Sequence, residues 1–73
     1  MSVLVKRSFA LAGHRTSVAL EEAFWAALTE IAGNRDRTLS ALVADIDAAR
    51  GPDQPLASAL RLAALAAFRA ASA

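Results

Sequence analysis

The sequence contains no cysteine and a single histidine, His14. Disulfide bonds are therefore excluded, and so is a zinc site built from the usual cysteine and histidine ligands. There is no glycine-rich phosphate loop, and no second base or metal ligand stands at a useful spacing from His14. We therefore expect a protein that is not an enzyme and that carries no metal or other cofactor.

Long hydrophobic runs are missing as well. The apolar stretches near the N-terminus, residues 3–5 and 9–12, are too short and too interrupted for a signal peptide. The alanine- and leucine-rich stretch 56–73 contains Arg61 and Arg69, which makes it a poor membrane span. We expect a soluble, cytoplasmic chain with no membrane partner.

Acidic residues are absent from the first part of the chain. Residues 1–20 contain Lys6, Arg7 and Arg15 and no acid, a charge of +3, whereas the remainder has five basic and seven acidic residues, a charge of −2. This distribution has two interpretations, which the charges alone leave open. Either one edge of the molecule meets a polyanion, or the terminus is solvated and its cations are incidental.

The short chain limits the core that one copy can bury. A domain of 73 residues is marginally stable alone, and small natural domains depend on disulfides, metals or oligomerisation. The first two are excluded here, and 56% of the residues are hydrophobic, more than a monomer of this size covers easily. We therefore expect an oligomer.

The hydrophobic pattern changes from strand to helix between residues 14 and 25. Apolar and polar side chains alternate up to Leu20, which predicts a strand over residues 14–20. From there the apolar residues Phe24, Ala27, Leu28 and Ile31 follow helical spacing, which predicts a helix over residues 21–34. The outward side of the strand would carry a guanidinium, a hydroxyl and a methyl group, all of which can contact base edges in a major groove.

Residues 1–13 are extended in character. Val3, Val5, Phe9 and Leu11 share one parity, and Arg7 interrupts this apolar side. Gly13 predicts a turn or bulge before the strand 14–20. The sequence does not decide whether this segment pairs with that strand, follows DNA or is a mobile arm.

Two further helices are predicted. Residues 38–50 begin at Thr38, a good N-cap, and repeat apolar residues at helical spacing. Asp45 and Asp47 do not share a helix face, so they do not form an acid–base pair. Residues 54–71 form an apolar helix that must pack on something. We expect it to pack against the two preceding helices and to add core to a dimer, with Leu60 and Phe68 buried.

This order of elements resembles the ribbon-helix-helix DNA-binding proteins. The similarity is closest to a bacterial subgroup and spans nearly the whole chain. The residues that carry it are Lys6-Arg7-Ser8, Gly13-His14-Arg15-Thr16-Ser17, Leu20-Glu21, Phe24-Trp25, Leu28, Ile31-Ala32, Leu39, Leu42, Ile46-Asp47, Arg50 and Ser58-Ala59.

The resemblance implies a mainly α fold with a short N-terminal strand, in one domain (1–73) that forms an intertwined homodimer and has an additional C-terminal helix. A strand from each chain would pair to form the ribbon in the major groove of double-stranded DNA. The residues expected to contact bases are Arg15, Ser17 and Ala19. The residues expected to contact phosphates are Lys6, Arg7, Thr38, Leu39 and Ser40, the last three through backbone N–H groups.

The last helix leaves one alternative open. Its Ser58-Ala59-Leu60 run also resembles the second helix of the family. If residues 54–71 are that helix, residues 38–50 are an insertion and the phosphate anchor moves to residues 56–58.

Three functions remain to be distinguished. The first is a transcriptional regulator, repressor-like, that covers a promoter as one dimer or as several side by side. The second is an antitoxin whose last helix contacts a toxin protein. The third is a helical adaptor that binds another protein and has no role with nucleic acid.

Overall fold

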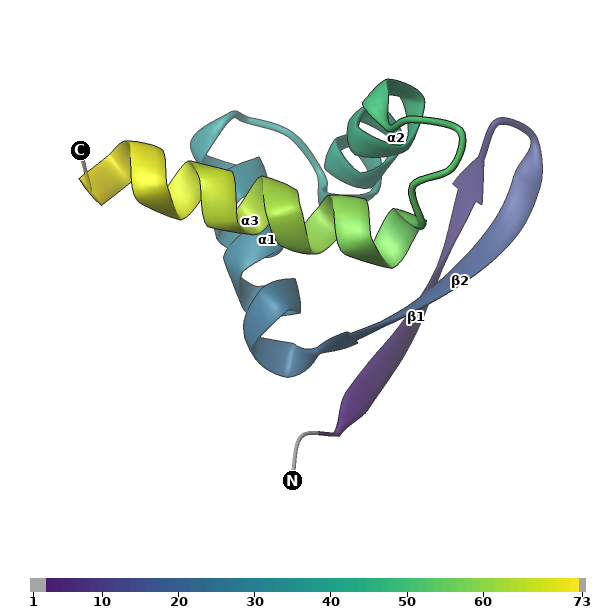
Figure 1. The fold of residues 1–73 in the computed structure, drawn as a ribbon, viewed down its shortest axis with the longest axis horizontal. Helices are drawn as coiled ribbons and strands as arrows, with labels where there is room; N and C mark the ends of the chain where they lie inside the picture. The colour runs from purple at the N-terminus through teal and green to yellow at the C-terminus, as the bar shows by residue number, and fades with distance from the viewer. Residues whose placement is uncertain (1–2, 73) are drawn as a thin grey trace.

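The computed structural model describes residues 3–72 and contains a hairpin followed by three helices (Figure 1). The strands are β1 (Leu4–Leu11) and β2 (His14–Glu21), and the helices are α1 (Glu22–Asn34), α2 (Leu39–Ala49) and α3 (Leu56–Ser72). The helices gather on one side of the long, twisted hairpin. The expected mainly helical chain with an N-terminal strand and an additional C-terminal helix is confirmed.

The segment that the sequence left undecided forms β1, which pairs antiparallel with β2. Leu11 faces His14 at the turn, and Leu4 faces Glu21 at the other end. One chain thus forms a two-stranded ribbon by itself, whereas the resemblance implies one strand from each of two chains. Residues 1 and 2 of the expected segment 1–13 lie outside the described residues, and β2 extends one residue beyond the expected range 14–20.

A two-residue turn joins the strands. Ala12 and Gly13 both have positive φ, +50° and +81°, which is the pattern of a type I′ turn. Glycine adopts this conformation without strain, whereas the Cβ of Ala12 makes it less favourable. The right-handed twist of such a turn matches the twist of the flanking strands.

The buried stripe of α1 differs from the predicted one. Trp25, Leu28 and Ala32 are buried, while Phe24 and Ile31 are only half-buried. Both sets follow helical spacing, and the hairpin decides between them. Trp25 is 1% exposed, its ring lies 5.7 Å from that of Phe9, and its Nε1–H donates a hydrogen bond of 2.8 Å to the carbonyl oxygen of Val5.

A residue in the left-handed conformation, which the sequence did not indicate, follows the C-terminal end of α1. Asp36 has φ +54°, and its N–H donates to the carbonyl of Gly33 at 3.2 Å. The N–H of Arg37 donates to the carbonyl of Ala32 at 2.8 Å. This is the Schellman arrangement, in which glycine usually occupies the left-handed position. The turn directs the chain from α1 into α2.

Thr38 caps α2 as predicted, because its Oγ1 accepts a hydrogen bond of 3.0 Å from the N–H of Ala41. Leu42 and Val43 are the buried residues of this helix. At its C-terminal end, the guanidinium of Arg50 donates to Asp47 at 2.8 Å and to the carbonyl of Gln54 at 2.6 Å. These bonds hold the loop that leads to α3.

α3 lies across α1 and α2 and also contacts β2 (Figure 1). Leu60 is fully buried, so the prediction that this helix contributes to the core is confirmed for its first half. Phe68 is 70% exposed, so it adds nothing to the core of a single chain, and its expected burial in a dimer stays a prediction. Helical geometry carries the second half of α3 beyond the end of the core. Within residues 3–72, no helix is both long enough and apolar enough to cross a bilayer.

Candidate nucleic-acid interface

The hairpin has one side against the helices and one side open. Alternate residues of β1 and β2 pack inward, and the buried ones are Phe9, Leu11, Val18 and Leu20. The other alternate residues point outward together with the end pair Leu4 and Glu21, and we call the following six the ribbon face: Lys6, Ser8, Ala10, Arg15, Ser17 and Ala19. All of these are exposed except Ala19, which is half-buried. The ribbon face thus combines two long cations with four small side chains.

The residues that were expected to contact bases, Arg15, Ser17 and Ala19, all lie on the ribbon face. Pairing places Ala10 opposite Arg15, Ser8 opposite Ser17 and Lys6 opposite Ala19. The two serine Oγ atoms are 2.9 Å apart and form a hydrogen bond at the centre of the face. Sequence reasoning missed Ser8 and Ala10. Ser8 and Ala10 alternate with Lys6 in the sequence, which indicates that the three share one side of an extended segment. Only the pairing of β1 with β2 shows that this side is also the side of Arg15 and Ser17.

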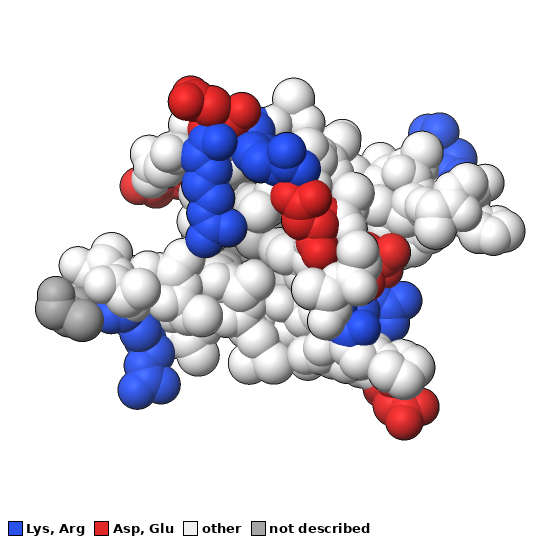
Figure 2. Space-filling view, turned by 90° about the horizontal axis from the view of Figure 1, so that it is seen from above, with Lys and Arg blue, Asp and Glu red and all other residues white. Residues whose placement is uncertain are grey.

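The cations of the ribbon face form no ion pair with another residue of the described part of the chain. The ion pairs in residues 3–72 join Arg37 to Asp45, Arg50 to Asp47 and Arg61 to Glu21, at 2.6, 2.8 and 2.8 Å. Lys6 and Arg15 belong to none of them. On the side shown in Figure 2, basic atoms lie in separate groups, several of them next to acidic atoms. The ribbon face therefore carries two cations that no acid within residues 3–72 pairs with.

Glu21, the acid at the end of β2, is neutralised by α3. The Nε and Nη2 atoms of Arg61 donate to its Oε1 at 3.1 and 2.8 Å. A hydrogen bond from the Glu21 backbone and the bond from Arg61 lower the pKa of the Glu21 carboxyl. Arg61 also lies over the ring of Phe24, 5.7 Å from its centroid. This contact joins the ribbon to α3 and limits repulsion of a polyanion by Glu21.

Arg7 lies on the other side of the hairpin from Lys6. Its guanidinium carbon is 5.5 Å from the centroid of the Trp25 ring, a cation–π contact. Arg7 therefore does not join Lys6 and Arg15 on the ribbon face. Its position explains the charge that interrupts the apolar side of β1, because Trp25 provides a partner for it.

The other expected phosphate contacts lie at the start of α2. Thr38 accepts the N–H of Ala41, while the first N–H groups of any helix lack partners within the helix. Leu39 and Ser40 stand in this first turn. The positive end of the helix dipole favours an anion there. In the described part of the chain, no group of three potential metal ligands comes together.

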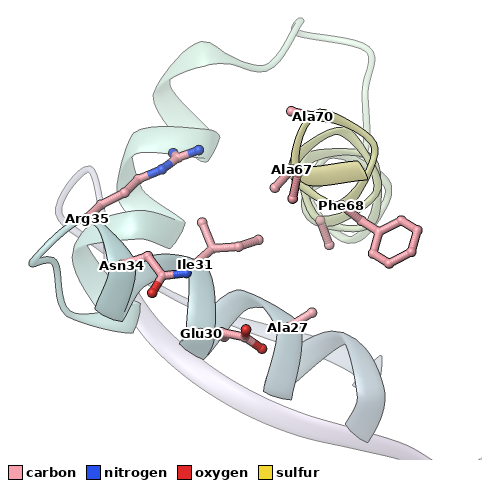
Figure 3. Close-up of a pocket in the computed structure, with 10 residues that line it drawn as sticks. Ala27, Glu30, Ile31, Asn34, Arg35, Ala67, Phe68 and Ala70 are labelled. Carbon is pink, nitrogen blue, oxygen red and sulfur yellow. The ribbon is translucent and has the colours of Figure 1, made fainter. Parts of the chain in front are cut away.

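A second open surface lies on α3. Leu62, Leu65 and Phe68 are exposed and form what we call the apolar α3 face. A cavity of about 350 Å³ adjoins it and is lined almost entirely by apolar atoms, with Phe24 and Ala27 on the α1 side. A second cavity of about 350 Å³ lies between the C-terminal ends of α1 and α3. Ile31 and Ala67 point into this second space, and the Phe68 ring points away from it (Figure 3).

The family model of the ribbon-helix-helix domain matches residues 4–68, which include the hairpin and most of the helical part. The chain belongs to the ribbon-helix-helix family. No curated protein matches it, and no solved structure does. Ribbon-helix-helix domains bind DNA, commonly form dimers and are typical of transcription regulators and antitoxins rather than of enzymes. The matched range includes both α2 and the part of α3 up to Phe68, so both helices lie within the family's domain.

Proposed function

We propose that the protein is a sequence-specific DNA-binding transcriptional regulator, repressor-like and cytoplasmic, that inserts the ribbon face into the major groove. The observation that supports this most directly is the pair of exposed cations, Lys6 and Arg15, which have no acidic partner in residues 3–72. The groove is about 12 Å wide and admits a two-stranded ribbon. The small side chains between the cations allow the backbone to approach the base edges closely.

The expected base-contacting residues and the start of α2 each receive a role in this proposal. Arg15 donates to a guanine, the hydroxyl of Ser17 bonds to a base edge, and the methyl of Ala19 contacts a thymine methyl. The backbone N–H groups of Leu39 and Ser40, in the first turn after Thr38, hold a phosphate. These phosphate contacts would set the orientation of the ribbon on the duplex. Arg7 is left out, because its guanidinium lies over Trp25.

The proposed regulator is a homodimer in which a second copy covers the apolar α3 face. Phe68 is 70% exposed beside cavities of about 350 Å³. An apolar cavity of roughly 150 Å³ is large enough to bind benzene, so a phenyl ring from a second copy fits such a space. The ribbon is already complete in one chain, so this dimer does not require an exchange of strands. Several dimers side by side would cover a longer promoter.

The test of DNA binding is a titration of duplex DNA from upstream of the protein's own gene with purified protein. Affinity should fall steeply with salt concentration, because phosphate contacts release counterions. Arg15→Ala should weaken binding to the best site by about 1–3 kcal/mol, or about 5- to 150-fold, and relax its sequence preference.

The matched control is Arg69→Ala, which removes an arginine on α3 and should leave the preference unchanged. A parent protein that binds no duplex DNA would contradict the proposal. Equal binding by the parent and by Arg15→Ala would show that the ribbon face does not read bases.

The apolar α3 face also favours a second candidate, an antitoxin in which a toxin protein covers this surface. Sedimentation of the purified chain distinguishes the two. A dimer that Phe68→Ser dissociates supports the homodimer. A folded monomer of 7.6 kDa, together with a toxin-like reading frame next to the gene, favours the antitoxin.

A further inference from the structure

The two strands of the hairpin carry the same short pattern. Lys6, Ser8 and Ala10 alternate along β1, and Arg15, Ser17 and Ala19 alternate along β2, nine residues later. A cation, a serine and an alanine thus occur twice in the same order. The buried residues follow the same offset: Phe9 corresponds to Val18, and Leu11 corresponds to Leu20.

The observed register turns this repeat into an approximate two-fold symmetry. Ser8 faces Ser17, and their Oγ atoms are 2.9 Å apart. A two-fold axis through this pair, perpendicular to the ribbon, exchanges two antiparallel strands and moves each residue by nine positions. It therefore places Lys6 on Arg15 and Ala10 on Ala19. One chain presents two equivalent halves, each with a cation at its outer end and the serines at the centre.

We propose that one hairpin reads an inverted-repeat DNA element by itself, with Lys6 as a second base-reading residue equivalent to Arg15. This proposal rests on the proposed DNA-binding function and changes the role of Lys6, for which the sequence predicted a phosphate. Two-fold symmetry in a protein is matched by palindromic symmetry in its DNA site. Here that symmetry belongs to one chain and does not depend on a dimer.

The spacing of the cations sets the length of the element. Lys6 and Arg15 are four residues apart along the ribbon, about 13 Å at roughly 3.3 Å per residue. Base pairs rise about 3.4 Å each, so the two cations reach bases about four base pairs apart. A guanine at each end, one on each strand, provides the O6 and N7 acceptors that arginine and lysine bind. The symmetry is imperfect, because the lysine ammonium does not form the bidentate hydrogen bonds of the arginine guanidinium.

The test is selection of bound sequences from a random duplex library by the full-length parent, Lys6→Ala, Arg15→Ala and Lys6→Arg. The parent should select an imperfect inverted repeat with its two halves about four base pairs apart. Lys6→Ala and Arg15→Ala should each erase the preference in one half, with affinity losses of about 5- to 150-fold. Lys6→Arg should make the selected repeat more symmetric. Both cations are exposed, so thermal melts of these variants should match the parent.

Two other results have distinct meanings. If Lys6→Ala weakens all sequences alike while Arg15→Ala relaxes preference, Lys6 contacts a phosphate and the inference fails, although the proposed function stands. If the parent selects no sequence, the proposed function fails as well. A dimer of hairpins would add a repeat about one helical turn, roughly 10 base pairs, away. Lys6→Ala would then keep the longer repeat, but each of its elements would keep a sequence preference only in the half that Arg15 reads.

Discussion

The ribbon face and the apolar α3 face are both uncovered, but they present opposite chemistry to solvent. The ribbon face carries two cations among serines and alanines, whereas the α3 face carries Leu62, Leu65 and Phe68. Water solvates the first well and the second poorly. The difference indicates two kinds of partner: a polyanion on the hairpin and an apolar protein surface on α3. Changes on one surface should therefore leave the function of the other intact.

The largest effect should come from removing α3 by truncation after Gly51. This change deletes the apolar α3 face but also Leu60, which is fully buried. Truncating one buried leucine to alanine costs about 2–5 kcal/mol, a large share of the stability of a small domain. Circular dichroism during heating should show no cooperative transition. A truncated chain that still melts cooperatively and binds DNA would make α3 a detachable docking segment.

Phe68→Ser should separate the two surfaces with a smaller effect on the fold. Phe68 is 70% exposed in one chain, so the free energy of unfolding of a dilute monomer should change by only about 0.5 kcal/mol or less. Sedimentation should shift from dimer to monomer, because the buried ring of the interface is lost. Leu60→Ala is the matched control, since it should lower the melting temperature strongly. A Phe68→Ser protein that stays dimeric would place the dimer interface elsewhere.

Asp36→Gly should stabilise the fold without altering either surface. Asp36 holds φ +54°, a conformation that costs an ordinary residue about 1 kcal/mol or more and costs glycine little. We expect the free energy of unfolding to rise by about 0.5–1 kcal/mol. Asp36→Ala removes the same carboxylate but keeps the Cβ, so it should not stabilise. DNA affinity and sedimentation should match the parent in both variants, and a change in either would link this turn to a surface.

The smallest effect concerns the contact between β2 and α3, Glu21 with Arg61. The pKa of Glu21 is lower in the folded state than in the unfolded chain, through its backbone hydrogen bond and Arg61. Its contribution to stability is therefore present above the unfolded pKa and is lost as the pH falls through the folded pKa. Denaturant melts of Glu21→Gln should lose less stability than the parent on acidification below about pH 4.3. Glu22→Gln, the neighbouring change, should follow the parent.

The sequence predicted the elements whose signals are local. Thr38 begins α2 because its hydroxyl can cap the helix, and the alternation before Leu20 is enough to predict a strand. The outward position of Arg15, Ser17 and Ala19 follows from the same alternation. These residues required no knowledge of what packs against them.

Other features depend on contacts between distant segments. Phe24 and Trp25 both fit a helical stripe, and only the hydrogen bond from Trp25 to Val5 selects the second. The pairing of β1, and with it the place of Ser8 on the ribbon face, is likewise a tertiary choice. Phe68 fits the apolar stripe of α3, but the core ends before it. The periodicity of a sequence predicts which side of a helix is apolar. It does not predict how far along the helix other elements pack against that side.

The position of Trp25 also gives the protein an internal optical probe. It is the only tryptophan in the sequence, and it joins β1 to α1 through Val5 and Phe9. Its fluorescence should therefore shift to the red when β1 leaves the helices, even if the helices stay folded. A ligand on the ribbon face binds the opposite side of the hairpin and does not contact the indole. Emission from this one residue would thus follow the attachment of the hairpin separately from its occupancy.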